Sequence, residues 1–139
     1  MSHIRSEKTK PEQIVAAYLR KNHMGYRRYS KSLPGKPDFV LTKYHSVIFV
    51  NGCFWHRHAG CKRATTPKSN QEYWNAKFQR NIERDKKEYE LLNALGWRVF
   101  IVWECQLGKD AESHLQKLVN DIISDGQHTF SEDLQYALQ

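Results

Sequence analysis

The sequence lacks any long hydrophobic run. Its best apolar segments are VIFV (47–50) and VFIVW (99–103), far short of the roughly 20 residues that a membrane-spanning helix needs. The N-terminal segment MSHIRSEKTK is charged and is followed by no signal-peptide core. We therefore expect a cytoplasmic protein with no membrane partner.

Cysteine is scarce, and repeats, low-complexity segments and flexible linkers are absent. The three cysteines are an odd number, so they cannot all pair with one another in disulfides. In a reducing cytosol a metal site is the better explanation of them. A chain of 139 residues without linkers predicts a single domain over residues 1–139 with one hydrophobic core. One small basic domain with a single site also predicts a monomer.

Acidic residues are in the minority, with 15 Asp and Glu against 22 Lys and Arg, for a net charge of +7. The basic excess falls in clusters such as RRYSK (27–31) and KFQRNIERDKK (77–87), where aromatic residues are interleaved. Such blocks favour a polyanionic partner, of which nucleic acid is the commonest. Charge alone is explained equally well by a solvated, soluble surface.

Hydrophobic periodicity predicts an α/β domain with a mixed β-sheet flanked by helices. A strand, a long helix and a further strand form a crossover, which would set the last strand parallel to an earlier one. The long helix has apolar residues at helical spacing, and Gly96 is its stop signal. The expected elements are a helix from Pro11, a short edge strand within 25–32, a hairpin of 36–41 and 45–50, a helix over 70–95, a strand over 97–104 and a helix over 110–124.

The apolar positions of the two later helices are expected to face the core. In the long helix these positions are Trp74, Phe78, Ile82, Tyr89, Leu92 and Leu95. In the last helix they are Leu115, Leu118, Val119, Ile122 and Ile123.

The segment NGCFWHRHAGC (51–61) concentrates metal ligands around two large aromatic residues. Zinc takes four nitrogen or sulfur ligands in a tetrahedron. Cys105 follows the last strand, and it would reach this segment if that strand neighbours 45–50. His56 and His58 point in opposite directions in an extended chain, so one can face the metal while the other faces elsewhere. The spacing favours the set Cys53, His58, Cys61 and Cys105; the alternative is ordinary buried thiols and surface histidines.

Asp38 lies in PGKPDFV, at the mouth of a predicted strand. A carboxylate at that position can hold a hard divalent cation near the sheet edge. The hairpin returns Val50 and Asn51 alongside it, a layout used by metal-dependent nucleases of the restriction-endonuclease type. An aspartate that caps a turn would give the same sequence signal.

Four segments together resemble the Vsr family of very-short-patch-repair endonucleases: TKPE (9–12), LPGKPDFV (33–40), VIFVNGCFWHRHAGC (47–61) and GWRVFIVWEC (96–105). The resemblance covers about residues 2–107, and residues 108–139 form a helical extension without a match. It implies a restriction-endonuclease-like fold with a structural zinc. It also implies Mg²⁺-dependent nicking of one strand of duplex DNA beside a T:G mismatch, which repairs deaminated 5-methylcytosine. The implied setting is the bacterial nucleoid, with a cytosine methyltransferase and mismatch-repair proteins as partners.

The resemblance also implies roles for particular residues. Asp38 and the main-chain carbonyl of Val50 would bind Mg²⁺, His56 would be the general base, and Glu12 would support the site. The zinc ligands would be Cys53, His58, Cys61 and Cys105, the set that the spacing favours.

Asn51 departs from the family pattern, because the best-known members have a histidine there. An amide can bind a phosphate but cannot carry a proton at neutral pH. Position 51 could therefore stabilise charge or, if it must protonate the leaving group, slow turnover. Two alternatives stay open: a zinc-stapled DNA-binding module that recognises distorted duplex without cutting, and a nicking enzyme of relaxed specificity.

The aromatic residues of the motif have a predicted role in DNA binding. The resemblance implies that Phe54, Trp55 and Trp74 intercalate beside the mismatch, since apolar wedges unstack and bend DNA. It also implies that Lys77 and Asn81 of the long helix contact the bases, to which both side chains are suited. The alternatives are core burial for the aromatic residues and a solvated helix face for Lys77 and Asn81.

Overall fold

The computed structural model describes residues 9–124, which form a four-stranded mixed sheet with helices on both faces. The strand order is β1 (Arg27–Arg28), β2 (Phe39–Leu41), β3 (Ser46–Asn51) and β4 (Arg98–Trp103). β1 and β2 pair antiparallel, as do β2 and β3, whereas β3 and β4 run parallel. The predicted edge strand, hairpin, crossover and mixed sheet are confirmed.

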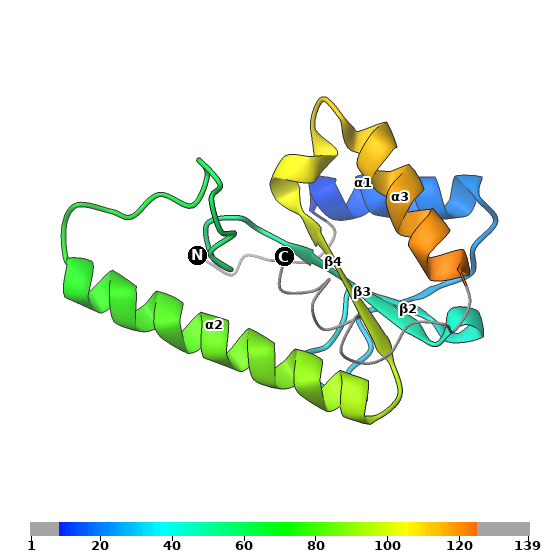
Figure 1. The fold of residues 1–139 in the computed structure, drawn as a ribbon, viewed down its shortest axis with the longest axis horizontal. Coiled ribbons are helices and arrows are strands. Elements are labelled where there is room, and N and C mark those ends of the chain that lie inside the picture. The colour runs from blue at the N-terminus through cyan, green and yellow to red at the C-terminus, as the bar shows by residue number, and fades with distance from the viewer. Residues whose placement is uncertain (1–8, 125–139) are drawn as a thin grey trace.

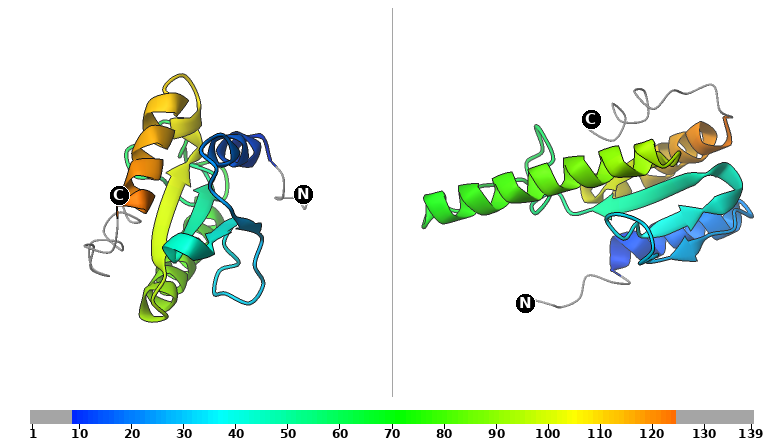
Figure 2. Two further views of the ribbon diagram at one scale, coloured as in Figure 1. Left: turned by 90° about the vertical axis from the view of Figure 1, so that its right-hand side faces the viewer. Right: turned by 90° about the horizontal axis from the view of Figure 1, so that it is seen from below.

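Three helices cover the sheet as two outer layers (Figures 1 and 2). α1 (Lys10–Lys21) and α3 (Ala111–Ile123) lie on one face, and α2 (Gln71–Ala94) lies on the other. The side chain of Thr9 accepts a hydrogen bond from the backbone N–H of Glu12, which caps the start of α1. Short 3₁₀ segments, Thr42–Tyr44 and Glu104–Leu107, follow β2 and β4.

Alternation along β3 divides the core into two halves. Ile48 points into the half beneath α1 and α3, together with Phe39 and Leu19. Val47 and Phe49 point toward α2, where they meet Leu92. Because neighbouring β3 residues face opposite layers, both halves are built from one strand. Among residues 9–124 no helix is long and apolar enough to cross a membrane.

The N-terminal half of α2 projects beyond the sheet, and the segment that joins β3 to α2 lies beside it (Figure 2). This overhang explains why Ile82 is 40% exposed, although its spacing predicted a core position. Phe78 is buried as predicted, but it packs on the rings of Phe54 and Trp74 instead of on the sheet. Where a helix extends beyond the sheet, its apolar residues are buried only if another segment of the chain packs on them.

Two further core predictions were wrong. Leu95 follows the end of α2 and is 58% exposed, and Ile123 at the end of α3 is 52% exposed. Both occur where the helix ends, so the helical spacing no longer directs the side chain toward the sheet. The part of the expected C-terminal extension from residue 125 onward lies outside the described residues.

Neighbouring leucines of α2 allow a direct test of this packing. Leu92 is fully buried against the sheet, whereas Leu91 is 45% exposed. Leu92→Ala is expected to lower the free energy of unfolding by about 2–5 kcal/mol, because it leaves a cavity in the core. Leu91→Ala, with the same change in volume and helix propensity, should cost less than about 1 kcal/mol. Equal losses in urea unfolding would contradict the placement of α2.

Candidate active site and metal centre

Asp38 lies at the mouth of β2, where the hairpin brings the end of β3 beside it. The backbone N–H of Val50 donates to Oδ2 of Asp38 at 2.7 Å. Burial raises the pKa of the Asp38 carboxyl to about 6, and the nearby charge of Glu12 acts in the same direction. The Val50 hydrogen bond and the positive charge of Arg28 oppose this rise in pKa without cancelling it. Asp38 therefore changes charge close to neutral pH.

Glu12 is a buried carboxylate in the first turn of α1, 3% exposed. It accepts hydrogen bonds from Nη2 of Arg28 at 2.7 Å and from the hydroxyl of Tyr29 at 2.6 Å. Arg28 also donates from Nε to the backbone carbonyl of Asp38 at 3.2 Å. One guanidinium thus links the helix carboxylate to the segment that carries Asp38.

Arg28 and Tyr29 are site residues that the sequence reasoning missed. Their segment, RRYSK, was interpreted only as part of an edge strand and as a basic cluster suited to a polyanionic partner. The structure reveals their role through the burial of Glu12 in the first turn of a helix, because a buried carboxylate requires charged or hydrogen-bonding partners.

His56 faces α2 and pairs with an aspartate there. Its Nδ1 lies 2.6 Å from Oδ2 of Asp85, which is 8% exposed. A carboxylate accepts and does not donate, so the Nδ1–H tautomer satisfies this contact and leaves Nε2 able to take up a proton. Sequence reasoning missed Asp85, because it interpreted the segment KFQRNIERDKK as basic surface.

Asn51 points toward α2 and not toward solvent. Its Nδ2 donates to the hydroxyl of Tyr89 at 2.9 Å, and the side chain is almost completely buried. Burial raises the pKa of the Tyr89 hydroxyl, with Asp85 adding to the effect, so the tyrosine stays protonated at any physiological pH. The Asn51 amide thereby ties the end of β3 to the same helix that carries Asp85.

Four residues from two distant segments converge in a cluster that could hold a metal ion: Cys53, His58, Cys61 and Cys105. One ligand atom from each lies within 4.8 Å of the others. Nδ1 of His58 lies 3.4 Å from Sγ of Cys105 and 3.7 Å from Sγ of Cys53. Zinc bonds of about 2.3 Å to sulfur and 2.0 Å to nitrogen set the edges of a tetrahedron at about 3.6 Å. The cluster therefore fits a four-ligand metal site.

Neighbouring side chains hold the cluster in place. Trp103 stacks on the ring of His58 with centroids 4.2 Å apart, and Oε1 of Glu104 accepts from the backbone N–H of Cys53 at 3.3 Å. Burial raises the pKa of the Cys53 thiol to about 12, so a bound cation is needed to keep it as a thiolate at neutral pH.

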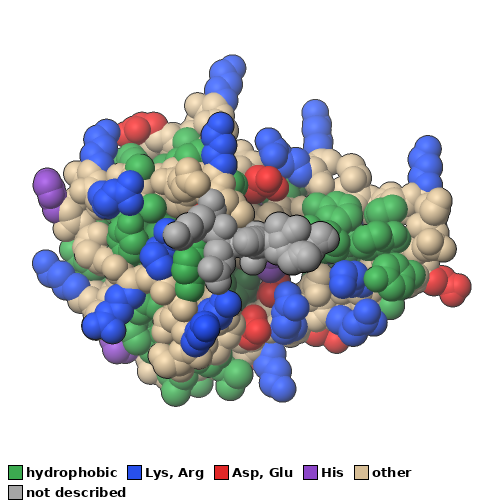
Figure 3. All heavy atoms as spheres, turned by 180° about the vertical axis from the view of Figure 1, so that it is seen from behind, with side chains coloured by type: hydrophobic (Ala, Val, Ile, Leu, Met, Phe, Trp, Pro, Cys, Tyr) green, Lys and Arg blue, Asp and Glu red, His purple; other side chains and the backbone are tan. Residues whose placement is uncertain are grey.

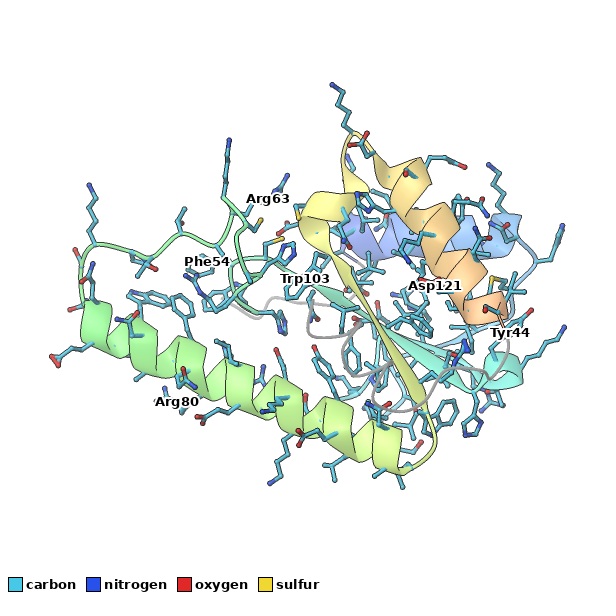
Figure 4. All side chains as sticks on the ribbon, viewed as in Figure 1. Tyr44, Phe54, Arg63, Arg80, Trp103 and Asp121 are labelled. Carbon is cyan, nitrogen blue, oxygen red and sulfur yellow. The ribbon has the colours of Figure 1, made fainter. Side chains whose placement is uncertain are left out.

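The aromatic residues of the motif form one cluster with the overhanging end of α2. Phe54 points from the loop toward α2 (Figure 4) and packs edge-on against Trp74, Phe78 and Trp55. Trp55 remains 46% exposed, and Tyr73, whose ring packs edge-on against Trp74, is 58% exposed. The structure thus brings Phe54, Trp55 and Trp74 together at a partly exposed tip.

Lys77 and Asn81 lie under this tip. The Nζ atom of Lys77 is 5.9 Å from the centre of the Trp55 ring, and Nδ2 of Asn81 donates to the Trp55 carbonyl at 3.3 Å. Both side chains therefore contact Trp55, the exposed tryptophan of the motif.

Arg57 connects several parts of this loop, and sequence reasoning did not identify it as a site residue. Its backbone is left-handed, with φ of 54°, and its guanidinium lies 4.0 Å from the centre of the Phe78 ring. The guanidinium donates to the carbonyls of Phe54, Ala64 and Thr65 and to the hydroxyl of Thr66, at 2.9–3.3 Å. Arg57 thus joins the aromatic cluster to the segment after Cys61 without using the metal.

The contacts of Arg57 can be tested with a pair of matched substitutions. Arg57→Lys keeps the positive charge and the trypsin cleavage site but loses the planar guanidinium. We therefore expect the free energy of unfolding to fall by about 1–3 kcal/mol and trypsin to cleave faster within residues 61–69. Arg63→Lys is the control, because the Arg63 side chain is exposed and its guanidinium lies 3.8 Å from the Glu104 carboxylate. Equal proteolysis of the two variants would show that Arg57 does not organise the loop.

Comparison with known proteins identifies relatives over most of the chain. The family model described as DNA mismatch endonuclease Vsr matches residues 1–63. Type II nicking enzyme V.NmeAIP of Neisseria meningitidis is 42% identical over 124 residues, 88% of each chain. Type II nicking enzyme V.XorIIP of Xanthomonas oryzae pv. oryzae is 43% identical over 107 residues, 77% of this chain and 78% of the relative. The DNA mismatch endonuclease Vsr of Escherichia coli is 43% identical over 107 residues, 77% and 68% of the two chains.

Proposed function

This chain belongs to the Vsr family of DNA mismatch endonucleases, and we propose that it is a Mg²⁺-dependent enzyme that nicks one strand of duplex DNA beside a T:G mismatch. The observation that carries the proposal is that Asp38 lies beside the end of β3 and close enough to His56, the partner of Asp85, for the charge of the imidazole to lower the pKa of Asp38. A cation ligand and a proton acceptor at one sheet edge are what phosphodiester hydrolysis requires.

Asp38 and the backbone carbonyl of Val50 are the proposed Mg²⁺ ligands. The carboxylate is a hard oxygen donor, and its position is fixed by the Val50 N–H and by the guanidinium that holds its backbone carbonyl. When bound there, Mg²⁺ supplies neutralisation of the charge that develops on the phosphate. Glu12 supports the site from α1 through Arg28.

His56 is the proposed general base. Asp85 holds Nδ1–H of the imidazole, which orients the ring and favours the form that accepts a proton at Nε2. Water that attacks the phosphate would give its proton to Nε2, and Asp85 would stabilise the resulting imidazolium. Asn51 cannot carry a proton, so we assign it the role of fixing the end of β3 through Tyr89.

The aromatic tip is the proposed DNA wedge. Phe54, Trp55 and Trp74 would insert beside the mismatch, with Lys77 and Asn81 positioned to reach the bases. Figure 3 shows hydrophobic side chains gathered at one end of a face on which many basic side chains lie. Phosphate contacts from basic residues would position the duplex, while the wedge recognises distorted, easily unstacked DNA.

We further propose that the four-ligand cluster holds zinc and fixes the loop that carries the wedge. His58→Asn should reduce zinc affinity by more than the roughly 10–100-fold typical of losing a residue that supports a ligand. The change should also lower the thermal stability. His114→Asn, at an exposed position on α3, is the matched control and should keep one zinc per chain. Zinc content and melting by circular dichroism measure both, and a His58 variant with unaltered zinc binding would contradict the assignment.

The Asp38→Asn variant allows the contribution of Asp38 to catalysis to be measured apart from its effect on the stability of the fold. The folded pKa of about 6 lies above the ordinary 3.8, so the stability that protonation contributes is complete below pH 4 and is lost as the pH rises through 6. Asparagine is neutral at every pH and still accepts from Val50. Without added Mg²⁺, the free energy of unfolding of the variant should exceed that of the parent by up to about 3 kcal/mol at neutral pH. Under acid conditions the two proteins should be equally stable.

The same variant should not nick a T:G duplex. Parent and variant are compared on end-labelled mismatched and fully paired duplexes with and without Mg²⁺, beside Asp110→Asn, an exposed aspartate next to α3. A nick that Asp38→Asn makes as fast as the parent would remove Asp38 from the mechanism. Tight binding by the parent without any nick would favour a non-cutting DNA-binding module, and equal nicking of paired duplexes would indicate relaxed specificity.

The cellular setting follows from the same proposal. An enzyme that corrects T:G mismatches would repair the product of 5-methylcytosine deamination, alongside the methyltransferase that makes this base and the mismatch-repair proteins. We propose that it acts as a monomer on the bacterial nucleoid.

A further inference from the structure

A cleft of about 460 Å³ opens beside His56, between the loop of residues 31–36 and the middle of α2. The loop contributes Lys31 and Lys36 to its walls, and α2 contributes Arg84, Asp85 and Glu88. The cleft shares His56 and Asp85 with the proposed active site, whereas Asp38 is not part of its lining. The cleft therefore lies next to the reaction centre and is distinct from the aromatic tip.

We propose that this cleft binds a backbone phosphate of the nicked strand, next to the phosphate at which cleavage occurs. The inference rests on the proposed nuclease function and adds the path of the strand: between the 31–36 loop and α2, past His56. Its ligand is a phosphodiester, and Lys31, Lys36 and Arg84 are the groups that recognise it.

The charges of the cleft favour an anion. Asp85 is already engaged by Nδ1 of His56 at 2.6 Å, and its other oxygen lies 3.5 Å from Nη2 of Arg84. The remaining carboxylate, Glu88, feels the positive charge of Arg84, and the lining carries Lys31 and Lys36 in addition. The cleft is therefore cationic beside the imidazole, and protonation of His56 during the reaction would add to its positive charge.

Backbone geometry fixes the width of the cleft. Gly35 has φ of 76°, and a Cβ added there would lie 3.0 Å from Oε1 of Glu88 and 3.1 Å from Cζ of Phe49. The loop therefore rests directly on α2 and β3, at a separation that only glycine allows. Lys36 follows with a left-handed backbone, φ 49°. This contact holds the loop of residues 31–36 against α2, so the cleft is formed before DNA binds.

Replacement of Glu88 tests the proposal through the direction in which DNA affinity changes. Burial raises the pKa of the Glu88 carboxyl, and the charge of Asp85 raises it further, against the opposing effect of Arg84. If a phosphate enters the cleft, this carboxylate repels it, so Glu88→Gln should tighten DNA binding several-fold. If the lysines are only solvated surface charge, the same substitution should leave DNA affinity unchanged.

The decisive measurement is the salt dependence of DNA binding. In Lys31→Ala/Lys36→Ala, we expect the slope of log K against log salt to become shallower by about one for each lysine. Affinity at low salt should fall roughly tenfold. Lys43→Ala is the matched control, since this lysine lies in the 3₁₀ turn beside Tyr44, at the end of the molecule far from Phe54 (Figure 4). It should lose neither affinity nor slope beyond what one distant charge contributes.

Failure of this inference is distinguishable from failure of the nuclease proposal. A parent protein that nicks T:G duplexes while the double lysine variant binds with the parent slope would overturn the cleft and leave the enzyme intact. A parent that binds but does not nick would still test the cleft through the slopes of parent, double variant and Glu88→Gln. Circular dichroism of each variant confirms that the fold is retained. A shallower slope together with tighter binding by Glu88→Gln would establish the phosphate site.

Discussion

The parallel pairing of β3 with β4 is the constraint on which both sites depend. Its register sets Asn51 opposite Trp103, so Cys53 and Cys105 each come two residues beyond the last paired position at the same edge. A slip of one residue would turn Val47 and Phe49 away from α2 and would also separate the two cysteines. Hydrophobic burial under the two helix layers thereby fixes the geometry of a polar site that could not fix itself.

Asp38 illustrates the opposition between stability and chemistry at this edge. The carboxylate is useful as a cation ligand only when it is ionised, yet burial favours the protonated form. The Val50 N–H and Arg28 reduce this cost and position the group, while the charge of Glu12 outweighs the help from Arg28. Such an arrangement lets a divalent cation replace the missing positive charge, so binding of the cation and ionisation of Asp38 favour each other.

Sequence reasoning predicted features that depend on periodicity or on ligand type. The parallel direction of the last strand follows from the crossover rule, and the four candidate metal ligands follow from the chemistry of cysteine and histidine at the end of β3. It failed where a residue acts through a partner distant in sequence. Asp85 resembled any acid in a basic helix, and Arg57 resembled any loop cation, until folding placed His56 and Phe78 beside them. The predicted burial of Ile82 was wrong for a geometric reason, because hydrophobic periodicity does not reveal where the sheet ends.

The order of residues in the motif also has a physical explanation. With a metal bound, the candidate ligands on either side of Phe54 and Trp55 would fix the ends of a short segment but leave the direction of its rings free. Arg57 removes that freedom by binding carbonyls on both arms of the loop while lying against Phe78. The backbone is thus held by polar contacts, and the aromatic side chains need not be buried to keep their positions. Trp55 can remain exposed because neither the metal cluster nor Arg57 relies on its burial for stability.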